Sequence, residues 1–241
     1  MASADNSILV ELTNFPGRPL IGSRWVDAFL QAETSLLQSI KTSLGKRLAL
    51  GEEIVPPLIE VFRFTHYCAP DKIKVILVGQ DPYPTGGWAD GLAFSSAATI
   101  SPSLKRIFAE IKNSTGQTRT DSDLTGWARQ GVLLVNATMT RRPGKNGDHK
   151  DVDWLPFTMH LIKTVMSSVK CRPDNNSLIF ILLGAQAKRI TQWITSPERG
   201  IHFLTAGHPS PLNVTVPFME SGIFKRCNDI LGPERAVAWG G

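Results

Sequence analysis

Three residues whose side chains can take part in polar chemistry stand at the ends of apolar runs. Asp81 and His208 each follow such a run by three residues, and Asn136 directly ends another. A carboxylate can activate water or face a cation, an imidazole can donate to a developing anion, and an amide offers both a donor and an acceptor. Each residue alone also has an ordinary explanation, as a helix cap, a turn residue or a loop histidine.

The surrounding sequence alternates short apolar runs with helical patterns. The runs cover 73–78, 132–135, 178–183 and 202–205, and the helical patterns cover 25–44, 103–113, 154–169, 185–194 and 218–231. This alternation predicts an α/β fold, a single domain with a central four-stranded parallel sheet flanked by helices. Because ligands bind beyond the carboxyl ends of parallel strands, the three polar residues are expected at one mouth.

Length and charge limit the organisation and the partners. The chain has 241 residues, with 26 Lys and Arg against 21 Asp and Glu, a formal charge of +5. No linker divides it, so we predict one domain at 21–241 after a flexible N-terminal arm at 1–20. The positive charge favours a polyanionic partner such as nucleic acid, although charge alone is a weak indicator.

The cysteines and the apolar runs bear on the compartment. Three scattered cysteines, Cys68, Cys171 and Cys227, suggest neither a disulfide framework nor a zinc site. No signal-like N-terminus and no run long enough to cross a bilayer is found. We therefore expect a soluble intracellular monomer, in the cytoplasm or nucleus, without a membrane role.

Four short motifs carry a family resemblance. They are GQDPY at 79–83, GLAFS at 91–95, GVLLVN at 131–136 and HPSPL at 208–212. In order and spacing they resemble those of the family 1 uracil-DNA glycosylases, over residues 55–231. The resemblance implies a base-flipping DNA repair hydrolase that releases uracil, leaves an abasic site, and needs no metal or organic cofactor.

The resemblance assigns the catalytic roles. Cleaving an N-glycosidic bond develops positive charge on the sugar and negative charge on the departing base, so both must be stabilised. Asp81 matches the family aspartate that activates the attacking water and faces the sugar. His208 matches the histidine that donates to uracil O2.

The same resemblance places Gln80, Tyr83, Phe94 and Asn136 around the base. The Asn136 amide can pair with the N3 donor and the O4 acceptor of uracil, and cytosine reverses both. Two unmatched groups would cost roughly 2 to 6 kcal/mol. Tyr83 matches the residue that blocks the thymine methyl, and Phe94 matches the aromatic on which uracil stacks.

DNA contacts are implied for a further set. Leu212 matches the apolar wedge that fills the gap left by a flipped base. The loops that grip phosphates are represented by Pro102, Ser103, Gly184, Ala185, Pro209 and Ser210, with another such loop at Pro56-Pro57. A basic rim near these loops is expected from Lys105, Arg106, Arg141, Arg142, Lys145, His149, Lys150, Lys188 and Arg189.

Four positions depart from the family pattern. Pro84 and Asp90 stand where histidine is common, Ser101 replaces a usual proline, and Ala185 replaces a usual serine. We expect lower DNA affinity and altered electrostatics near the water, but an active enzyme.

Two other functions remain open. A DNA-binding or scaffold subunit, such as a replication accessory with an unidentified partner, would also be basic. A nucleotide-phosphate loop is a second alternative, although GxGxxG and GK[ST] are both missing and Asp81 would repel phosphate.

Overall fold

The computed structural model describes residues 21–32, 34–144, 149–170, 177–194, 200–213 and 216–241. The predicted arm at 1–20, Cys171 and Lys145 lie outside these residues. Within them, no helix combines the length and the apolar character that crossing a bilayer would require.

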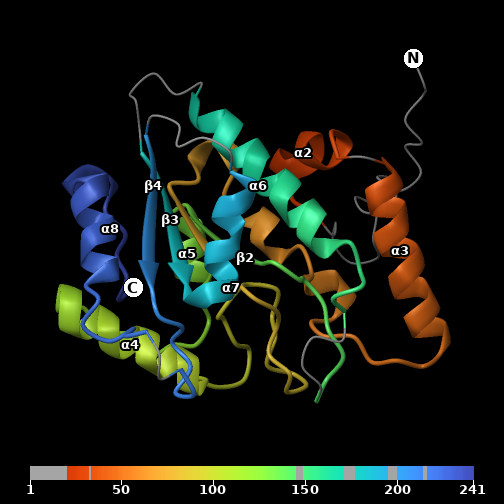
Figure 1. The fold of residues 1–241 in the computed structure, drawn as a ribbon, viewed down its shortest axis with the longest axis horizontal. Helices are drawn as coiled ribbons and strands as arrows, with labels where there is room; N and C mark the ends of the chain where they lie inside the picture. Colours follow the sequence, from red (N-terminus) through yellow and green to blue (C-terminus); the bar gives the residue numbers. More distant parts are fainter. Residues whose placement is uncertain (1–20, 33, 145–148, 171–176, 195–199, 214–215) are drawn as a thin grey trace.

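A four-stranded parallel sheet forms the centre of the fold (Figure 1). Its strands are β1 Val75–Gly79, β2 Val132–Asn136, β3 Leu178–Leu183 and β4 Ile201–Ala206. Their order is β2-β1-β3-β4. The predicted fold class is therefore confirmed; β3 has the predicted bounds, and the ends of the other strands differ from the prediction by at most two residues. All of β1 and β3 and all but the last residue of β2 are buried, as expected for strands covered on both faces.

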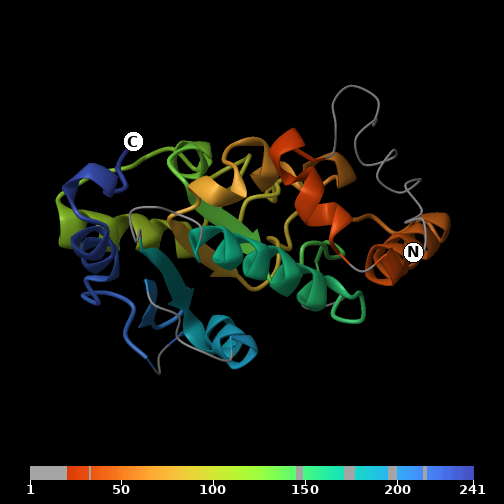
Figure 2. The ribbon, with the colours of Figure 1, turned by 90° about the horizontal axis from the view of Figure 1, so that it is seen from above.

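Helices cover both faces of the sheet (Figure 2). The helices α4 Pro102–Thr115 and α8 Ile223–Leu231 pack together on one face. The helix α6 Trp154–Lys170 lies on the other face. The opposite faces of α4 and α6 follow from right-handed crossovers, since α4 connects β1 to β2 in one direction along the sheet and α6 connects β2 to β3 in the opposite direction. The strand order therefore reverses beside β1, where a ligand crevice is expected.

Several predicted helices differ from those observed. The pattern at 25–44 is divided into a 3₁₀ turn Ser23–Trp25, α2 Val26–Leu30 and α3 Thr34–Ala49. The pattern at 185–194 becomes α7 Gly184–Lys188 followed by a 3₁₀ turn Arg189–Trp193.

The last helix starts later than predicted, and one helix was not predicted. The helix α8 begins at Ile223 because Gly222 adopts a left-handed conformation, with φ of 62°. The short helix α5 Thr125–Arg129 precedes β2. The remaining 3₁₀ turns are Leu58–Glu60, Arg63–His66, Pro70–Lys72 and Pro233–Arg235.

Candidate active site

The loops that follow the strands open onto one cavity of about 390 Å³. Among the predicted site residues, those that line it are Gln80, Asp81, Tyr83, Phe94, Ser103, Asn136, His208 and Ser210. Gly184 and Ala185 line a smaller cavity of about 190 Å³, which shares Gln80, Phe94 and His208 with the first. The structure therefore brings the proposed catalytic and base-binding residues together. Pro102, Pro209 and Leu212 lie outside both linings.

Asp81 lies two residues beyond β1, with 18% of its side chain exposed. Its Oδ2 accepts a hydrogen bond from Arg141 Nη1 at 2.9 Å. Burial raises the pKa of the Asp81 carboxyl above its ordinary value, while the charges of Arg141 and Lys150 oppose that rise.

Asn136 is the last residue of β2 and is paired in register with Gly79, the last residue of β1. A Cβ atom on Gly79 would come 2.1 Å from Oδ1 of Asn136, so only glycine leaves space for this amide. The side chain of Asn136 makes no hydrogen bond to the described residues. Its donor and its acceptor are therefore both available to a ligand in the cavity.

His208 follows β4 and is held in one tautomer. The backbone N–H of Ser210 donates to Nδ1 at 3.0 Å, which places the ring proton on Nε2. Burial lowers the pKa of His208 and so favours the neutral ring. Gly184 allows the close approach of this histidine, since its φ is +86° and an added Cβ would lie 2.9 Å from the Cβ of His208. The result is a neutral imidazole that offers a single N–H donor.

Two aromatic residues form walls of the cavity. Tyr83 donates its hydroxyl to the backbone oxygen of Phe94 at 2.8 Å and also pairs with Ser101 Oγ at 2.8 Å. Burial raises the pKa of Tyr83 to about 12, so the phenol stays protonated. Phe94 has a left-handed backbone, with φ of 66°, and its ring centroid lies 6.5 Å from that of His208.

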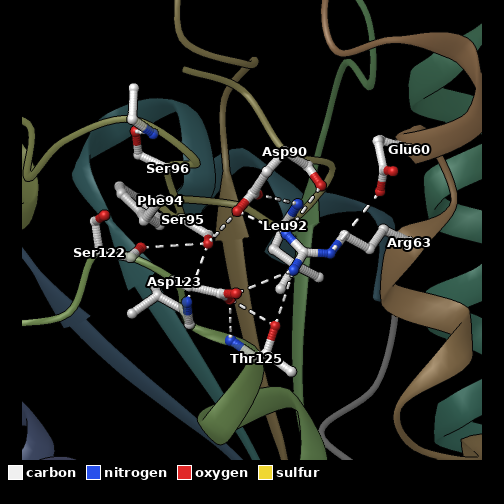
Figure 3. Close-up of polar contacts among 12 residues, drawn as sticks. Glu60, Arg63, Asp90, Leu92, Phe94, Ser95, Ser96, Ser122, Asp123 and Thr125 are labelled. Atoms are coloured by element: carbon white, nitrogen blue, oxygen red, sulfur yellow. Dashed lines mark hydrogen bonds and ion pairs between the residues drawn. The ribbon is translucent and has the colours of Figure 1, made fainter. Parts of the chain in front are cut away.

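Figure 3 shows a buried network beside the turn that carries Phe94. Asp90 accepts from the backbone of Leu92 at 3.1 Å and from Ser95 Oγ at 2.6 Å. Arg63 Nη1 lies 2.7 Å from Asp90 Oδ2, the same oxygen that accepts from Ser95. The departure at Asp90 therefore acts on the turn, and Asp90 is not among the residues that line the main cavity.

A further departure, Ser101, also has structural partners. Ser101 caps α4 by accepting from the N–H of Leu104 at 3.1 Å, and its Oγ pairs with the hydroxyl of Tyr83.

Arg63 has further partners beside Asp90. It donates to Asp123 Oδ2 at 3.2 Å and to Thr125 Oγ1 at 3.0 Å, which joins the network around Asp90 to α5. Sequence reasoning missed Arg63 and Asp123, because their contacts join segments distant along the chain.

The segment expected to enter DNA projects from the protein. Leu212 is 90% exposed. Its backbone N–H donates to Ser210 Oγ at 3.2 Å, and Arg106 Nη1 donates to the backbone oxygen of Ser210 at 3.2 Å. These bonds hold the base of the segment and leave the leucine side chain in solvent.

The predicted basic rim requires a correction. Arg141 and His149 are 2% and 0% exposed, so they do not belong to a solvent-facing rim. Arg141 turns toward Asp81, whereas His149 bonds to Thr140 Oγ1 and Glu52 Oε1, each at 2.8 Å. Their neighbours in sequence are basic and polar, so the local composition gave no sign of burial. In the described parts of the chain, no group of three acidic, histidine or cysteine residues is arranged to hold a metal ion.

Comparison with known proteins identifies the family. The model of the uracil DNA glycosylase superfamily matches residues 65–231. The chain belongs to the uracil DNA glycosylase superfamily. The resemblance inferred from the four motifs and the expected enzyme class are thereby confirmed.

Relatives in the family include viral and bacterial proteins. A uracil-DNA glycosylase of Varicella-zoster virus is 37% identical over 215 residues, which is 87% of this chain and 67% of that protein. One from Bacteroides thetaiotaomicron is 39% identical over 78% of this chain and 84% of its own length. The crystal structure of mimivirus uracil-DNA glycosylase matches with a TM-score of 0.75 and 25% identity, covering 88% of this chain and 84% of that one.

Proposed function

We propose that this protein hydrolyses the N-glycosidic bond between uracil and deoxyribose in DNA and leaves an abasic site. The observation that carries the proposal is the shared cavity of Asp81, Asn136 and His208, which come from the ends of three different strands. A water-activating acid, a base-reading amide and a neutral donor are thus presented to one ligand. A protein that only bound DNA would not need this combination.

In the proposed reaction, water attacks C1′ of the sugar as the bond from C1′ to N1 breaks. The bonding electrons leave with uracil, and Asp81 takes the proton of the water. The carboxylate also faces the positive charge of the sugar. His208 donates Nε2–H to O2 as negative charge builds there, in agreement with the tautomer fixed by Ser210.

We assign the selection of uracil over other bases to the residues that line the main cavity. Asn136 pairs with N3–H and O4 of uracil and rejects cytosine, whose edge has the opposite pattern. Tyr83, fixed through Phe94 and Ser101, occupies the space that the C5 methyl of thymine would need. Phe94 provides the stacking surface, and Gln80 completes the lining.

Access to the base requires that it leave the helix. Leu212 is proposed to fill the vacated position, because it is apolar, exposed and attached to the loop that carries His208. The phosphate contacts are assigned to the adjoining loops, at Pro102, Ser103, Gly184, Ala185, Pro209 and Ser210. The backbone N–H groups and hydroxyls of the non-proline residues in these loops would provide them.

A uracil-release assay tests the proposal. The protein, in chelator, is incubated with single- and double-stranded DNA that contains one uracil, and free uracil is measured beside an Asp81→Asn variant. We expect release by the native chain and a loss of about 10² to 10⁴-fold in the variant. Asp71→Asn, at a carboxylate that is 55% exposed, is the matched control and should keep full activity. The proposal would be refuted if the native chain released no uracil, or if Asp81→Asn released uracil at the same rate as the native chain.

A further inference from the structure

A buried arginine lies against the carboxylate that we assign to water activation. The Arg141 side chain is 2% exposed, and its Nη1 donates to Asp81 Oδ2 at 2.9 Å and to the backbone oxygen of Pro82 at 3.3 Å. One guanidinium nitrogen therefore contacts both the side chain of Asp81 and the backbone beside it. Arg141 also lines the main cavity.

The rest of the fold fixes Arg141 in this position. Its backbone forms an antiparallel bridge with Val55, in which each residue donates to the other at 2.9 Å. Its Nε donates to the backbone oxygen of Arg142 at 3.3 Å. The bridge thus holds the backbone of Arg141, and the Nε bond holds its guanidinium group. Because arginine does not lose its proton in proteins, it presents a permanent positive charge to Asp81.

The two carboxylate oxygens of Asp81 have different surroundings. Oδ2 is occupied by Arg141, whereas Oδ1 accepts no hydrogen bond from the described residues. An arginine on one oxygen restricts rotation of the carboxylate, and the other oxygen can then accept a proton from water.

We propose that Arg141 is a positioning residue for Asp81, because it holds the carboxylate in one orientation and places a permanent positive charge beside it. The inference rests on the proposed function, since it assigns a task to the same carboxylate. It also explains why an arginine that the sequence placed on a solvent-facing rim is buried.

Other charged and titratable groups face Asp81 and must be separated from this effect. Lys150, in the loop after β2, lowers the pKa of Asp81, as Arg141 does, whereas burial raises it. His149 shares a cavity of about 20 Å³ with Asp81 and Lys150. His208 and Tyr83 line the main cavity on its other sides. Among these groups, Arg141 is the one with a hydrogen bond to the carboxylate in the described structure.

The variant Arg141→Met removes the charge and keeps an unbranched side chain. Loss of the cation should raise the pKa of Asp81, because a neighbouring positive charge favours the ionised carboxyl. The reaction needs ionised Asp81, so the acid limb of the single-turnover rate should move to higher pH by the same amount. At the pH plateau, we expect a loss of about 10-fold or more from disorder of the carboxylate. A variant with a lower rate but an unmoved acid limb would show a merely structural role and overturn the proposal.

Two further variants sharpen the test. Arg141→Lys keeps the charge, so the acid limb of its rate should stay near that of the native chain. Its rate at the pH plateau should fall, because an ammonium cannot make the Nε and Nη1 hydrogen bonds of the planar guanidinium together. Arg142→Met is the matched control, since Arg142 is 41% exposed and pairs with Glu52 at 3.7 Å. It should weaken DNA binding without moving the acid limb. An equal shift in Arg142→Met would assign the effect to overall charge and refute a specific pair.

Titration of Asp81 without DNA separates this proposal from the proposed function. Carbon-13 NMR of the side-chain carboxyl, assigned with Asp81→Asn, reports the pKa directly. A higher pKa in Arg141→Met supports the pair, and an unchanged pKa overturns it, whether or not the chain releases uracil. If Arg141→Met does not fold, as judged by thermal unfolding, Arg141→Gln also removes the charge and replaces it in the comparison, with Arg141→Lys as the variant that keeps the charge.

Discussion

The hydroxyl of Tyr83 donates a hydrogen bond to the backbone oxygen of Phe94 at 2.8 Å. This bond joins the loop after β1 to the turn at the far side of the cavity, so the two aromatic walls form one rigid unit. The same hydroxyl pairs with Ser101, the cap of α4. Contacts within the connection between β1 and α4 therefore hold these two walls of the cavity in place.

Replacement of Tyr83 tests this wall. Tyr83→Ala should release measurable thymine from DNA, because the volume that excludes the methyl group is removed. Tyr83→Phe keeps the ring and should still reject thymine, but the lost hydroxyl leaves polar partners unpaired and should cost about 1 to 3 kcal/mol of stability. The measurements are thymine release and chemical unfolding. Thymine release by Tyr83→Phe alone would contradict the steric assignment.

Gly79 should control the base-reading amide from across the sheet. Gly79→Ala places a Cβ 2.1 Å from Asn136 Oδ1, so the amide must move, and uracil release should fall by about 10 to 100-fold for a displacement of an ångström or less. Gly45→Ala is the control, because nothing lies within 4 Å of its added Cβ in α3. It should retain activity and gain about 0.5 to 1 kcal/mol of stability. Equal activity in both variants would show that the position of the amide does not matter.

His208 should remain neutral over the working range of pH. Its pKa in the folded protein is lowered by burial, below the unfolded value of about 6.5. The resulting stability is fully present above that value and is lost as pH falls below it. Nitrogen-15 NMR of the imidazole should show the proton on Nε2 at pH 7, with His208→Gln used for assignment. A proton on Nδ1, or a titration midpoint above the unfolded value, would contradict the donor role.

Leu212 should matter for duplex DNA and little for folding. Leu212→Ala should change stability by less than about 0.5 kcal/mol, because the side chain is 90% exposed. Its rate on duplex DNA should fall more than its rate on a single strand, since a single strand needs little unstacking. Leu50→Ala, at an 87% exposed leucine, should affect neither rate. A uniform loss on both substrates would refute the wedge.

Asp90 should matter for folding more than for chemistry. Asp90→Asn removes the charged partner that lies 2.7 Å from the partly buried guanidinium of Arg63, which keeps Asp123 at 3.2 Å, and we expect a loss of about 1 to 3 kcal/mol of stability. Uracil release per folded molecule should be affected less than in Asp81→Asn. The control is Asp229→Asn, where the carboxylate is 57% exposed and paired with Lys225. Unfolding and activity measured on the same samples separate the two effects.

The sequence predicted the sheet and the cavity because their signals are local. Apolar runs predict strands, parallel strands bring their carboxyl ends together, and Asp81, Asn136 and His208 each follow a strand. The pair of Arg141 with Asp81 could not be predicted this way. It depends on a bridge between Val55 and Arg141, 86 residues apart, and bridges of this kind have no periodic pattern.

The helix boundaries show a second limit. The pattern at 25–44 is amphipathic throughout, yet α2 ends at Leu30 and α3 starts at Thr34. No proline or glycine lies between the two helices, so the residue types do not mark that boundary. Gly222, in contrast, does mark the start of α8, and its left-handed conformation could have been anticipated from its residue type.

The exposure of Leu212 has an energetic consequence for the encounter with DNA. In the unbound protein, water surrounds nearly the whole isobutyl group. Moving a leucine side chain out of water is worth roughly 1.5 to 3 kcal/mol, a sum of the same order as the unstacking of one nucleotide. On the proposed function, the transfer of the Leu212 side chain from water into the base stack therefore offsets much of the cost of extruding the base. This gain arises only at a site where the stack can open.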